Sequence, residues 1–344
     1  GKERGQYQFC SPNDHVNMAQ STNDAYPSAM HIGLYLTHFQ VREALEKLIQ
    51  SFRNKEEEFA NIIKMGRTQL QDAVPMTLGQ SFGAYASAMT HELQRLEIAA
   101  KEFLYINMGA TAIGTGITAE PGYAEACIKY IREITGWDIK LSDNLIEATH
   151  DTSCMVAYAS ALKMIAIRMS KICNDLRLLS SGPRTGIAEI SLPPKQPGSS
   201  IMPGKVNPVI PEVVNQVCFK VIGNELTVCL ASEAAQLELN VMEPVMVQSI
   251  VQSSDWLIRA FDTLRIECID GIKANPDHCK HMVEHSIGIV TALKPFIGYS
   301  KSTEIAKEAL ETGGSVYQLV VEKGLLTKEQ LDTIMDPKHM IKPT

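Results

Sequence analysis

Long hydrophobic runs and aromatic side chains are scarce in this chain. No stretch approaches the ~18 consecutive apolar residues that a membrane-spanning helix requires, and the opening residues, Gly-Lys-Glu-Arg-Gly-Gln-Tyr, are not those of a signal peptide. Only 6% of the residues are aromatic. The sequence therefore predicts a chain that does not cross a membrane, with a core packed by aliphatic and small side chains rather than arranged as a β-sandwich.

Positive charge and paired cysteines are also lacking. The 32 Lys and Arg residues are outnumbered by 39 Asp and Glu residues, and the net charge of −7 argues against nucleic acid or an anionic membrane as the main partner. The eight cysteines are scattered, without a C-x-x-C pair, and most lie among apolar residues. We therefore expect buried free thiols in a reducing compartment, and hence a cytoplasmic protein.

Helical periodicity is what the chain has in abundance. Apolar residues recur at the spacing of one helix face, as at Ile32, Leu36 and Phe39, in segments rich in Ala, Leu, Met and Glu. The predicted long helices cover residues 25–64, 78–103, 143–179, 209–240 and 243–269. The predicted fold class is therefore all-α.

Clusters of glycine and proline break this pattern at residues 109–122, 182–211 and 275–276. Shorter helices are predicted after the last break, near residues 276–295, 302–312 and 315–323, and from residue 327. The last of them begins with a capping box, in which Thr327 is the N-cap and Gln330 lies three residues on. The sequence thus predicts a central long-helix bundle up to residue 274 and a small C-terminal helical domain over residues 275–344.

Several long helices carry apolar residues on more than one face, for example over residues 213–222. One slender bundle cannot bury all such faces. We therefore expect copies of the chain to associate.

The most informative segment is residues 198–208, Gly-Ser-Ser-Ile-Met-Pro-Gly-Lys-Val-Asn-Pro. Its glycines let the backbone approach a ligand and aim N–H groups at it, Lys205 supplies a positive charge, and Asn207 both donates and accepts hydrogen bonds. Such a loop suits a small dicarboxylate and the negative charge that develops when a proton is removed beside a carboxylate. It does not match a nucleotide-binding P-loop, because five residues rather than four separate its glycines and Val206 follows the lysine.

Three segments together resemble the signature blocks of the fumarase/aspartase superfamily: residues 13–24 (NDHVNMAQSTND), residues 66–75 (GRTQLQDAVP) and residues 198–208. Their order, and the long helices throughout, extend the resemblance over the whole chain. The resemblance implies a homotetramer with a multi-helix core, in which each active site combines residues of three subunits. It also implies an N-terminal domain of which residues 1–20 are the remnant, followed by the central bundle over residues 21–274.

Within the superfamily the sequence is most similar to the aspartases. Gln69 stands where fumarases carry histidine, and residues 21–27, 236–245 and 335–343 have the aspartase-like form. The resemblance implies a carbon–nitrogen lyase that reversibly deaminates L-aspartate to fumarate and ammonia. The reaction proceeds by abstraction of the C3 proton and an enediolate intermediate, so the site must stabilise charge that appears only at the transition state.

The resemblance also implies a role for each matching residue. Ser199 is the expected base, with its alkoxide stabilised by loop N–H groups and positive charge, and Gly198 and Gly204 are the supporting glycines. The expected ligands of the substrate are Lys205 and Asn207 for the α-carboxylate, Ser21, Thr22 and Ser200 for the β-carboxylate, and Asn23, Thr68 and Gln69 for the amino group. Glu212 matches the glutamate that pairs with the fumarase histidine. Because Gln69 is neither acid nor base, ammonia is expected to leave without a His-Glu acid.

Three alternatives stay open at this point: a class II fumarase acting on L-malate, another lyase of the superfamily acting on a larger succinyl substrate, and a non-catalytic structural member of the fold. No cofactor is expected to be required, although some aspartases are activated by divalent metal ions and the sequence does not settle this for the present chain. His278, His281 and His285 follow helical spacing that a zinc ion could use. They lack a paired-ligand motif and read as a polar helix face, so no metal ligand is assigned.

Overall fold

The computed structural model describes residues 1–196, 198, 201–202 and 204–336. The chain divides into two compact units. Unit 1 comprises Gly1–Glu46, Thr90–Ser170 and Asn215–Phe261, and unit 2 comprises Lys47–Met89, Lys171–Val214 and Asp262–Thr344. The predicted division at residues 20 and 274 stays a prediction.

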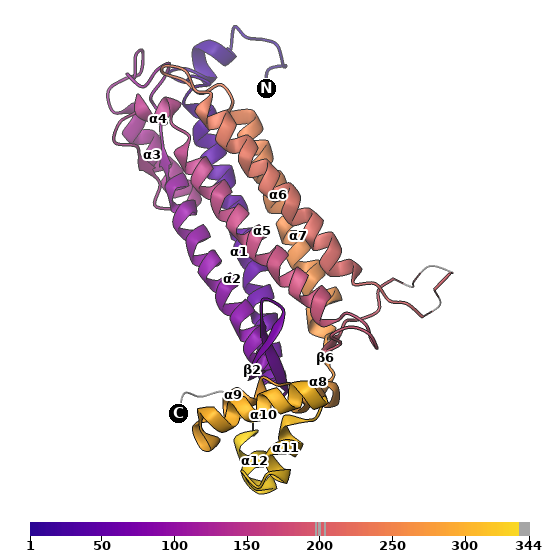
Figure 1. The fold of residues 1–344 in the computed structure, drawn as a ribbon. Coiled ribbons are helices and arrows are strands. Elements are labelled where there is room, and N and C mark those ends of the chain that lie inside the picture. The colour runs from indigo at the N-terminus through magenta and orange to yellow at the C-terminus, as the bar shows by residue number, and fades with distance from the viewer. Residues whose placement is uncertain (197, 199–200, 203, 337–344) are drawn as a thin grey trace. The chain divides into compact units, whose positions relative to one another are not determined.

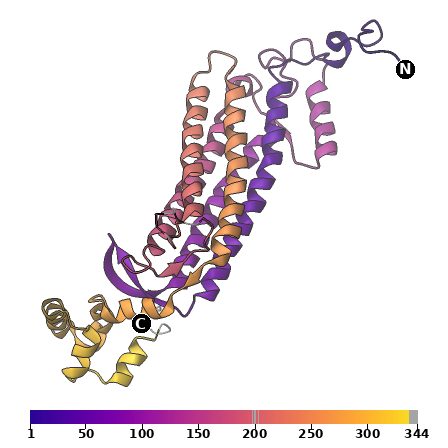
Figure 2. The ribbon, with the colours of Figure 1, turned by 90° about the vertical axis from the view of Figure 1, so that its right-hand side faces the viewer.

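Five long helices dominate the chain (Figure 1), and the predicted all-α class is confirmed. They are α1 (Ala25–Glu58), α2 (Leu78–Ala100), α5 (Ser153–Leu179), α6 (Val209–Glu233) and α7 (Glu243–Glu267). Each contributes residues to both units. Within unit 1 their segments lie side by side as a bundle, which both ribbon views show (Figures 1 and 2).

Unit 1 carries its short elements around the beginning of α1. They are η1 (Pro12–Val16), η2 (Lys101–Leu104), β3 (Tyr105–Ile106), α3 (Tyr123–Thr135), β4 (Lys140–Leu141) and α4 (Glu147–His150). Strands β3 and β4 pair in parallel. A small apolar cluster of Ile106, Met108, Ile128 and Ile139 joins β3 to α3 and to the segment before β4.

Unit 2 contains a hairpin and a group of short helices. Its elements are β1 (Ile63–Thr68), β2 (Gln71–Thr77), β5 (Ile190–Ser191), η3 (Ile269–Gly271), β6 (Lys273–Ala274), α8 (Pro276–His285), α9 (Ile289–Ile297), α10 (Tyr299–Thr312), α11 (Val316–Glu322) and α12 (Lys328–Ile334). Strands β1 and β2 pair in antiparallel fashion, as do β5 and β6. Met65 of β1 is fully buried in one apolar cluster with residues of α8–α12, including Leu293 and Val320, so the hairpin and the short helices share a core.

The long helices lie where the periodicity predicts them, but several ends and breaks differ. The segment predicted over residues 209–240 ends as α6 at Glu233, and the single helix predicted near residues 276–295 is two helices, α8 and α9, with a break at residues 286–288. The first helix ends at Glu58, not near residue 64, because Ile63 and Met65 leave the helical path to pair with β2 and to pack on the C-terminal core. The predicted segment 143–179 is interrupted at residues 151–152, between α4 and α5. Helix α3, flanked by Gly122 and Gly136 in left-handed conformations, is not among the predicted helices. The capping box of Thr327 and Gln330 is confirmed, with both reciprocal hydrogen bonds present.

Helix α6 differs from the expectation in its hydrophobicity. By length and composition alone it is apolar enough to cross a membrane, since its most apolar stretch has a mean hydropathy of 1.2, and only 39% of that stretch is buried. Asn215, Gln216 and Lys220 interrupt its apolar residues, so a search for uninterrupted runs misses it. Core helices of soluble proteins pass the same test. The observation therefore identifies a long apolar helix with much of its surface uncovered in the single chain.

A buried ion-pair cluster fixes the hairpin within unit 2. Glu189, which has no exposed surface, lies 2.7 Å from Lys64 Nζ and 2.5 Å from Arg67 Nη1, and both cations come from β1. The main chain of Glu189 is held as well, because the Asn275 N–H donates to its carbonyl at 2.9 Å. One buried carboxylate thus connects the hairpin to the segment that precedes β5 and to the start of α8.

We predict that Glu189→Gln strongly destabilises the protein. The substitution leaves the buried Lys64 without a compensating charge and Arg67 with only Asp72, 3.9 Å away, and breaking a buried pair typically costs about 3–5 kcal/mol. Chemical denaturation measures the free energy of unfolding. The control is Glu46→Gln, which removes an exposed partner of Arg42 and is expected to change stability by less than about 1 kcal/mol. Equal losses for the two variants would contradict a special role for Glu189.

Candidate active site

The loop of residues 198–208 folds back on itself before α6. A side chain at Gly198 would lie 2.5 Å from the Lys205 carbonyl oxygen and 3.0 Å from that of Met202, so only glycine fits. The Lys205 N–H donates to the Met202 carbonyl at 3.2 Å, and Gly204 has a positive φ of 81°. The two predicted supporting glycines therefore both have a backbone reason to be glycine. Ser199 and Ser200, the predicted base and its neighbour, lie outside the described residues.

The described end of this loop is positively charged. Lys205 is exposed and forms no ion pair with any described residue. Asn207 is half-buried and lies two residues before Val209, where α6 begins. The first N–H groups of a helix carry partial positive charge that adds to that of a nearby cation. The loop and the helix start are therefore suited to a carboxylate.

Glu212 lies in the first turn of α6, beside this loop. Its Oε1 is 3.9 Å from Arg177 Nε, and both side chains are about 40% exposed. In this chain the glutamate thus has a cation from α5 as a neighbour. Its supporting role stays a prediction.

Thr68 and Gln69 lie at the tip of the β1–β2 hairpin. Thr68 pairs with Gln71, so Gln69 and Leu70 form a two-residue turn. Both turn residues have positive φ, 53° for Gln69 and 62° for Leu70. Turns of this kind favour Asn and Gly, and side chains such as Gln and Leu adopt the left-handed region at a cost of about 1–3 kcal/mol each. The strained, exposed tip marks this turn as a place where side-chain identity serves something other than folding.

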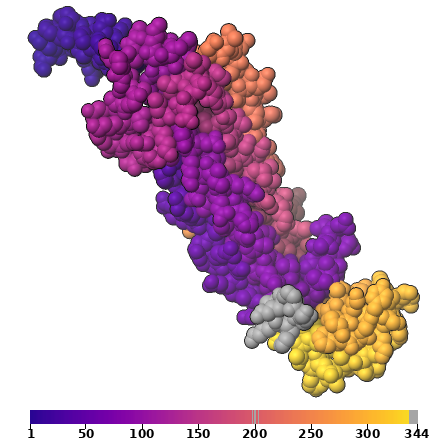
Figure 3. Space-filling view, turned by 90° about the vertical axis from the view of Figure 1, so that its left-hand side faces the viewer, coloured from indigo at the N-terminus to yellow at the C-terminus, as the bar shows by residue number. Residues whose placement is uncertain are grey.

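The body of the hairpin is held firmly beneath this tip. Asp72 accepts a hydrogen bond of 2.6 Å from the Ser286 hydroxyl. Side chains at Gly66 and Gly288 would lie 2.8 Å from the Val74 carbonyl oxygen and 2.6 Å from that of Ala73, so both positions need glycine for close approach of the backbones. In the space-filling view the hairpin projects, in purple, from the surface of unit 2 (Figure 3). A rigid base thus presents Thr68 and Gln69 to the surroundings.

Asp24 organises the block of residues 21–23 in unit 1. Its carboxylate is fully buried and accepts four backbone N–H groups: from Ser21 at 2.8 Å, Ala25 at 2.7 Å, Gly109 at 3.1 Å and Thr111 at 2.9 Å. Hydrogen bonds to an ionised group are stronger than those between neutral groups. Asp24 therefore joins the start of α1 to the glycine-rich turn that follows β3.

Asn23 is fixed by a second set of contacts. Its Nδ2 donates to the Ala112 carbonyl at 2.8 Å, and its own carbonyl accepts a hydrogen bond of 2.9 Å from Asn107 Nδ2. The Asn23 N–H donates to the Ser21 hydroxyl at 3.1 Å, as a helix N-cap would predict. Thr22 is exposed beside them. The block thus presents hydroxyl and amide groups on a backbone that is tied down on both sides.

The structure divides the predicted site residues between the units. Ser21, Thr22 and Asn23 belong to unit 1, whereas Thr68, Gln69 and the loop of residues 198–208 belong to unit 2. Among the residues that the structure describes, no hydrogen bond or ion pair joins Thr68 or Gln69 to that loop. No single described site therefore contains all of them, and their joint role stays a prediction.

Two residues that position the first block are missed by the sequence analysis. Asp24 stands inside the quoted segment 13–24, but only its four N–H donors, two of them 85 and 87 residues away, reveal its function as a clamp. Asn107 gives no sequence signal beyond its place before the glycine-rich segment. Asp24 and Asn107 hold the main chain of Asn23 and its neighbours in place by hydrogen bonds.

The described residues contain no group of three or more His, Cys, Asp or Glu side chains arranged to hold a metal ion. In α8, His278 Nε2 donates to the Ile187 carbonyl at 3.0 Å. His281 and His285 stack on each other, with ring centroids 4.0 Å apart. These contacts agree with the interpretation of that helix as a polar face.

Comparison with known proteins extends the sequence blocks to the whole chain. Residues 2–223 match the family described as Lyase, and residues 289–342 match that described as Fumarase C C-terminus. An aspartate ammonia-lyase of Pseudomonas aeruginosa is 56% identical over 344 residues, which are 100% of this chain and 73% of that protein.

Solved structures give the same result. The structure described as fumarate lyase:delta crystallin from Brucella melitensis bound to cobalt has a TM-score of 0.96 and 52% identity, covering 100% of this chain and 74% of the other. A class II fumarase from Schistosoma mansoni has a TM-score of 0.89 and 32% identity, covering 96% and 72%. Identity is thus higher to the aspartate ammonia-lyase than to this fumarase. The chain belongs to the lyase family of the fumarase/aspartase superfamily, the family that includes the aspartate ammonia-lyases.

Proposed function

We propose that this chain is a carbon–nitrogen lyase that reversibly deaminates L-aspartate to fumarate and ammonia. The observation that supports it most is the loop of residues 198–208, in which Lys205, which forms no ion pair with a described residue, and the amide of Asn207 lie just before the start of α6. A dicarboxylate substrate needs such a pairing of charge and directed donors. The identity of 56% over the whole chain to an aspartate ammonia-lyase supports the choice of substrate.

The reaction needs a base and stabilisation of developing charge. Ser199 in its alkoxide form takes the C3 proton, and the electron pair of that C–H bond is delocalised onto the β-carboxylate to give the enediolate. In the second step this pair forms the C2=C3 double bond, and the C–N bond breaks with its electrons on nitrogen. The substrate nitrogen is an ammonium group, so it leaves as neutral ammonia. The intermediate enediolate carries an additional negative charge on the β-carboxylate. Donors that are fixed before the reaction stabilise this charge without reorganisation.

The remaining site residues bind different groups of the substrate in this proposal. Lys205 and Asn207 bind the α-carboxylate in this proposal. Ser21, Thr22 and Ser200 bind the β-carboxylate, and Asn23, Thr68 and Gln69 surround the amino group. The clamp on Asn23 and the strained turn at Gln69 support these roles, because both features hold a polar side chain in one place at an energetic cost.

No cofactor is needed for these steps, because a base, directed donors and one cation supply all of the chemistry. Gln69 neither gives nor takes a proton, and Glu212 has Arg177 as a neighbour. We therefore propose elimination without a His-Glu acid. This distinguishes the chain from the fumarase alternative, in which hydroxide is a poor leaving group and needs a proton.

We further propose a homotetramer in which three copies contribute to each active site. Phe219, Leu226 and Leu230 lie on one face of α6 and are 58–61% exposed. Large apolar residues at this spacing form a stripe that needs another helix to cover it. Association with other copies covers α6 and allows the blocks at residues 21–23, 68–69 and 199–207 to come from different chains.

The cysteines support a cytoplasmic location in this proposal. All eight are free thiols, and five of them, Cys154, Cys173, Cys218, Cys268 and Cys279, are buried. Free thiols are typical of reducing compartments.

Ser199→Ala and Lys205→Met are expected to abolish turnover. The appearance of fumarate is followed by its ultraviolet absorbance, with L-aspartate and L-malate as parallel substrates. Fumarate is expected from L-aspartate only. Loss of the base lowers kcat by about 10²–10⁴-fold, and loss of the cation lowers kcat/KM by at least about 10²-fold. The control Lys301→Met removes an exposed lysine of α10 and leaves activity unchanged.

The oligomeric state, measured by light scattering, must stay the same in each variant. Fumarate from L-malate alone would identify a fumarase and contradict the proposal. No turnover in the unmodified chain would favour the non-catalytic alternative.

Asp24→Asn is expected to disturb the first block. An amide NH₂ group would face two of the four N–H groups that the carboxylate now accepts, so at least one donor loses its partner. We expect a loss of roughly 3 kcal/mol of stability and a raised KM for L-aspartate in the protein that still folds. The control is Asp14→Asn, at an exposed position of η1. An unchanged KM would show that the clamp does not position substrate ligands.

Gln69→His is expected to change the product balance. A histidine at the hairpin tip supplies a proton to a leaving hydroxide, so L-malate dehydration increases at least about tenfold relative to L-aspartate deamination. Gln71→His, two residues further on the same hairpin, is the matched control. If both variants dehydrate L-malate equally, the position has no special role in substrate choice.

A further inference from the structure

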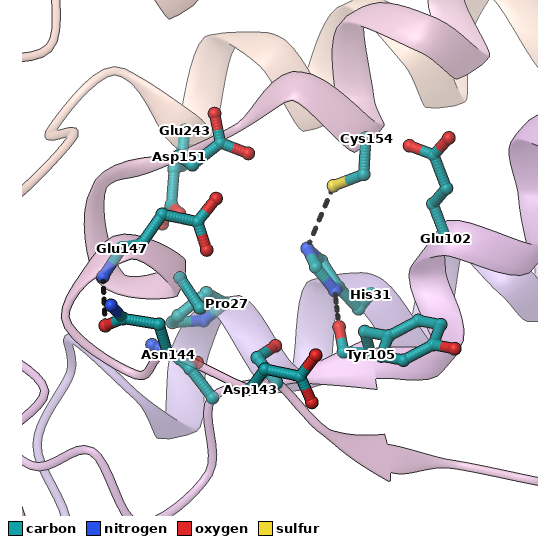
Figure 4. Close-up of a pocket in the computed structure, with 13 residues that line it drawn as sticks. Pro27, His31, Glu102, Tyr105, Asp143, Asn144, Glu147, Asp151, Cys154 and Glu243 are labelled. Carbon is teal, nitrogen blue, oxygen red and sulfur yellow. Dashed lines mark hydrogen bonds between the residues drawn. The ribbon is translucent and has the colours of Figure 1, made fainter.

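A separate cavity of about 310 Å³ lies in unit 1 (Figure 4). Its lining includes five carboxylates from separate parts of the unit: Glu102, Asp143, Glu147, Asp151 and Glu243. None of the described residues that line it is Lys or Arg. None of the five carboxylates forms an ion pair with a described residue. The cavity is therefore a region of concentrated negative charge.

Glu243 is the residue that points to a ligand. It is the first residue of α7, only 9% of its surface is exposed, and no described residue donates a hydrogen bond to its side chain. Its carboxylate points into the space between the lining residues (Figure 4). Burial raises the pKa of this carboxyl to about 7. A buried carboxylate without a partner is costly unless something supplies positive charge.

His31 and Cys154, which also line the cavity, are neutral. His31 Nδ1–H donates to the Tyr105 carbonyl at 2.8 Å, which leaves Nε2 as an acceptor for the Cys154 thiol at 3.4 Å. Burial lowers the pKa of His31 and raises that of Cys154 to about 12. Neither group therefore contributes the missing positive charge near neutral pH.

The spacing of the carboxylates selects the kind of cation. No three of the described ligand-type side chains are close enough to hold one metal ion. A dicarboxylate such as L-aspartate is repelled. Glu102 lies on the side of the cavity away from Glu147 and Glu243 (Figure 4), so a molecule with two positive charges separated by an alkyl chain can meet carboxylates on both sides. We propose that this cavity binds a small organic dication of the aliphatic diamine class, with Glu243 as its central anchor.

The site is distinct from the proposed substrate ligands but adjoins one of their supports. Asn107 lines the cavity and also donates to the carbonyl of Asn23. An occupant therefore touches the framework that holds the first substrate-binding block, without replacing any residue that binds substrate.

Binding is expected to depend on pH through Glu243. With a pKa of about 7, roughly a tenth of this carboxyl is ionised at pH 6 and roughly nine tenths at pH 8. If the dication binds only the ionised form, its affinity rises about tenfold between these values and a proton is released on binding. The titratable groups that line the cavity with Glu243 are His31 on α1, Glu102 on η2, Tyr105 on β3, Asp143 on the loop after β4, and Glu147, Asp151 and Cys154 on or beside α4 and α5.

The test is calorimetric titration of the purified protein with 1,4-diaminobutane at pH 6 and pH 8. We expect saturable binding at pH 8, at least tenfold tighter than that of 1-aminobutane or Mg²⁺ at equal ionic strength, and about tenfold weaker at pH 6. Glu243→Gln is expected to weaken binding at least tenfold and to remove the pH dependence. Asp255→Asn, an exposed position on the same helix, leaves both unchanged.

Circular dichroism and the oligomeric state identify any variant that fails to fold. If Glu243→Gln does so, Asp143→Asn on the loop after β4 replaces it, with the same expected loss. Equal binding of mono- and diamines, binding that survives in both variants, or no binding at either pH would overturn the proposal. These measurements do not use turnover, so their outcome is independent of the proposed reaction.

Discussion

A carboxylate that is buried away from water is costly unless it receives hydrogen bonds or positive charge, and the rest of this structure depends on where the protein supplies them. Asp24 meets it with four backbone N–H groups, and thereby ties the start of α1 to a turn more than 80 residues away. Glu189 meets it with two cations from β1, and thereby holds the hairpin. Each connection positions a block of proposed site residues. The placement of the proposed site residues and the stability of the fold thus rest on the same contacts.

The hairpin differs from an ordinary turn because its body is rigid and the backbone at its tip is strained. Close backbone contacts at Gly66 and Gly288 leave its body no freedom, while Gln69 and Leu70 keep left-handed conformations at the tip. Folding alone would favour Asn-Gly at such a turn. A polar side chain that is held at an energetic cost, on a rigid support, is what a site requires when its ligand must be met without reorganisation.

The sequence predicts what local interactions determine. Helix spacing, the capping box at Thr327 and the glycines of the loop at residues 198–208 are all encoded by near neighbours, and the structure agrees with each. The hairpin is missed because residues 59–65 continue the apolar spacing of a helix, and only the C-terminal core draws Met65 into a strand. Two of the partners of Asp24 are missed because they lie far away in the sequence. Local patterns locate the proposed ligands, but they do not reveal what holds those ligands in place.

The net charge of the chain hides an uneven distribution of its charged side chains. The loop before α6 presents Lys205 without a described ion-pair partner, whereas the cavity in unit 1 gathers five carboxylates without a cation. The loop attracts a dicarboxylate and repels a diamine. The cavity repels a dicarboxylate and attracts a diamine. Glu243 makes the second region more than an acidic surface, because its burial leaves a charge that water cannot fully solvate. An occupant there would act on Asn107, and through it on the carbonyl of Asn23. The same asparagine would then connect an acidic cavity that excludes the substrate to a block that binds it.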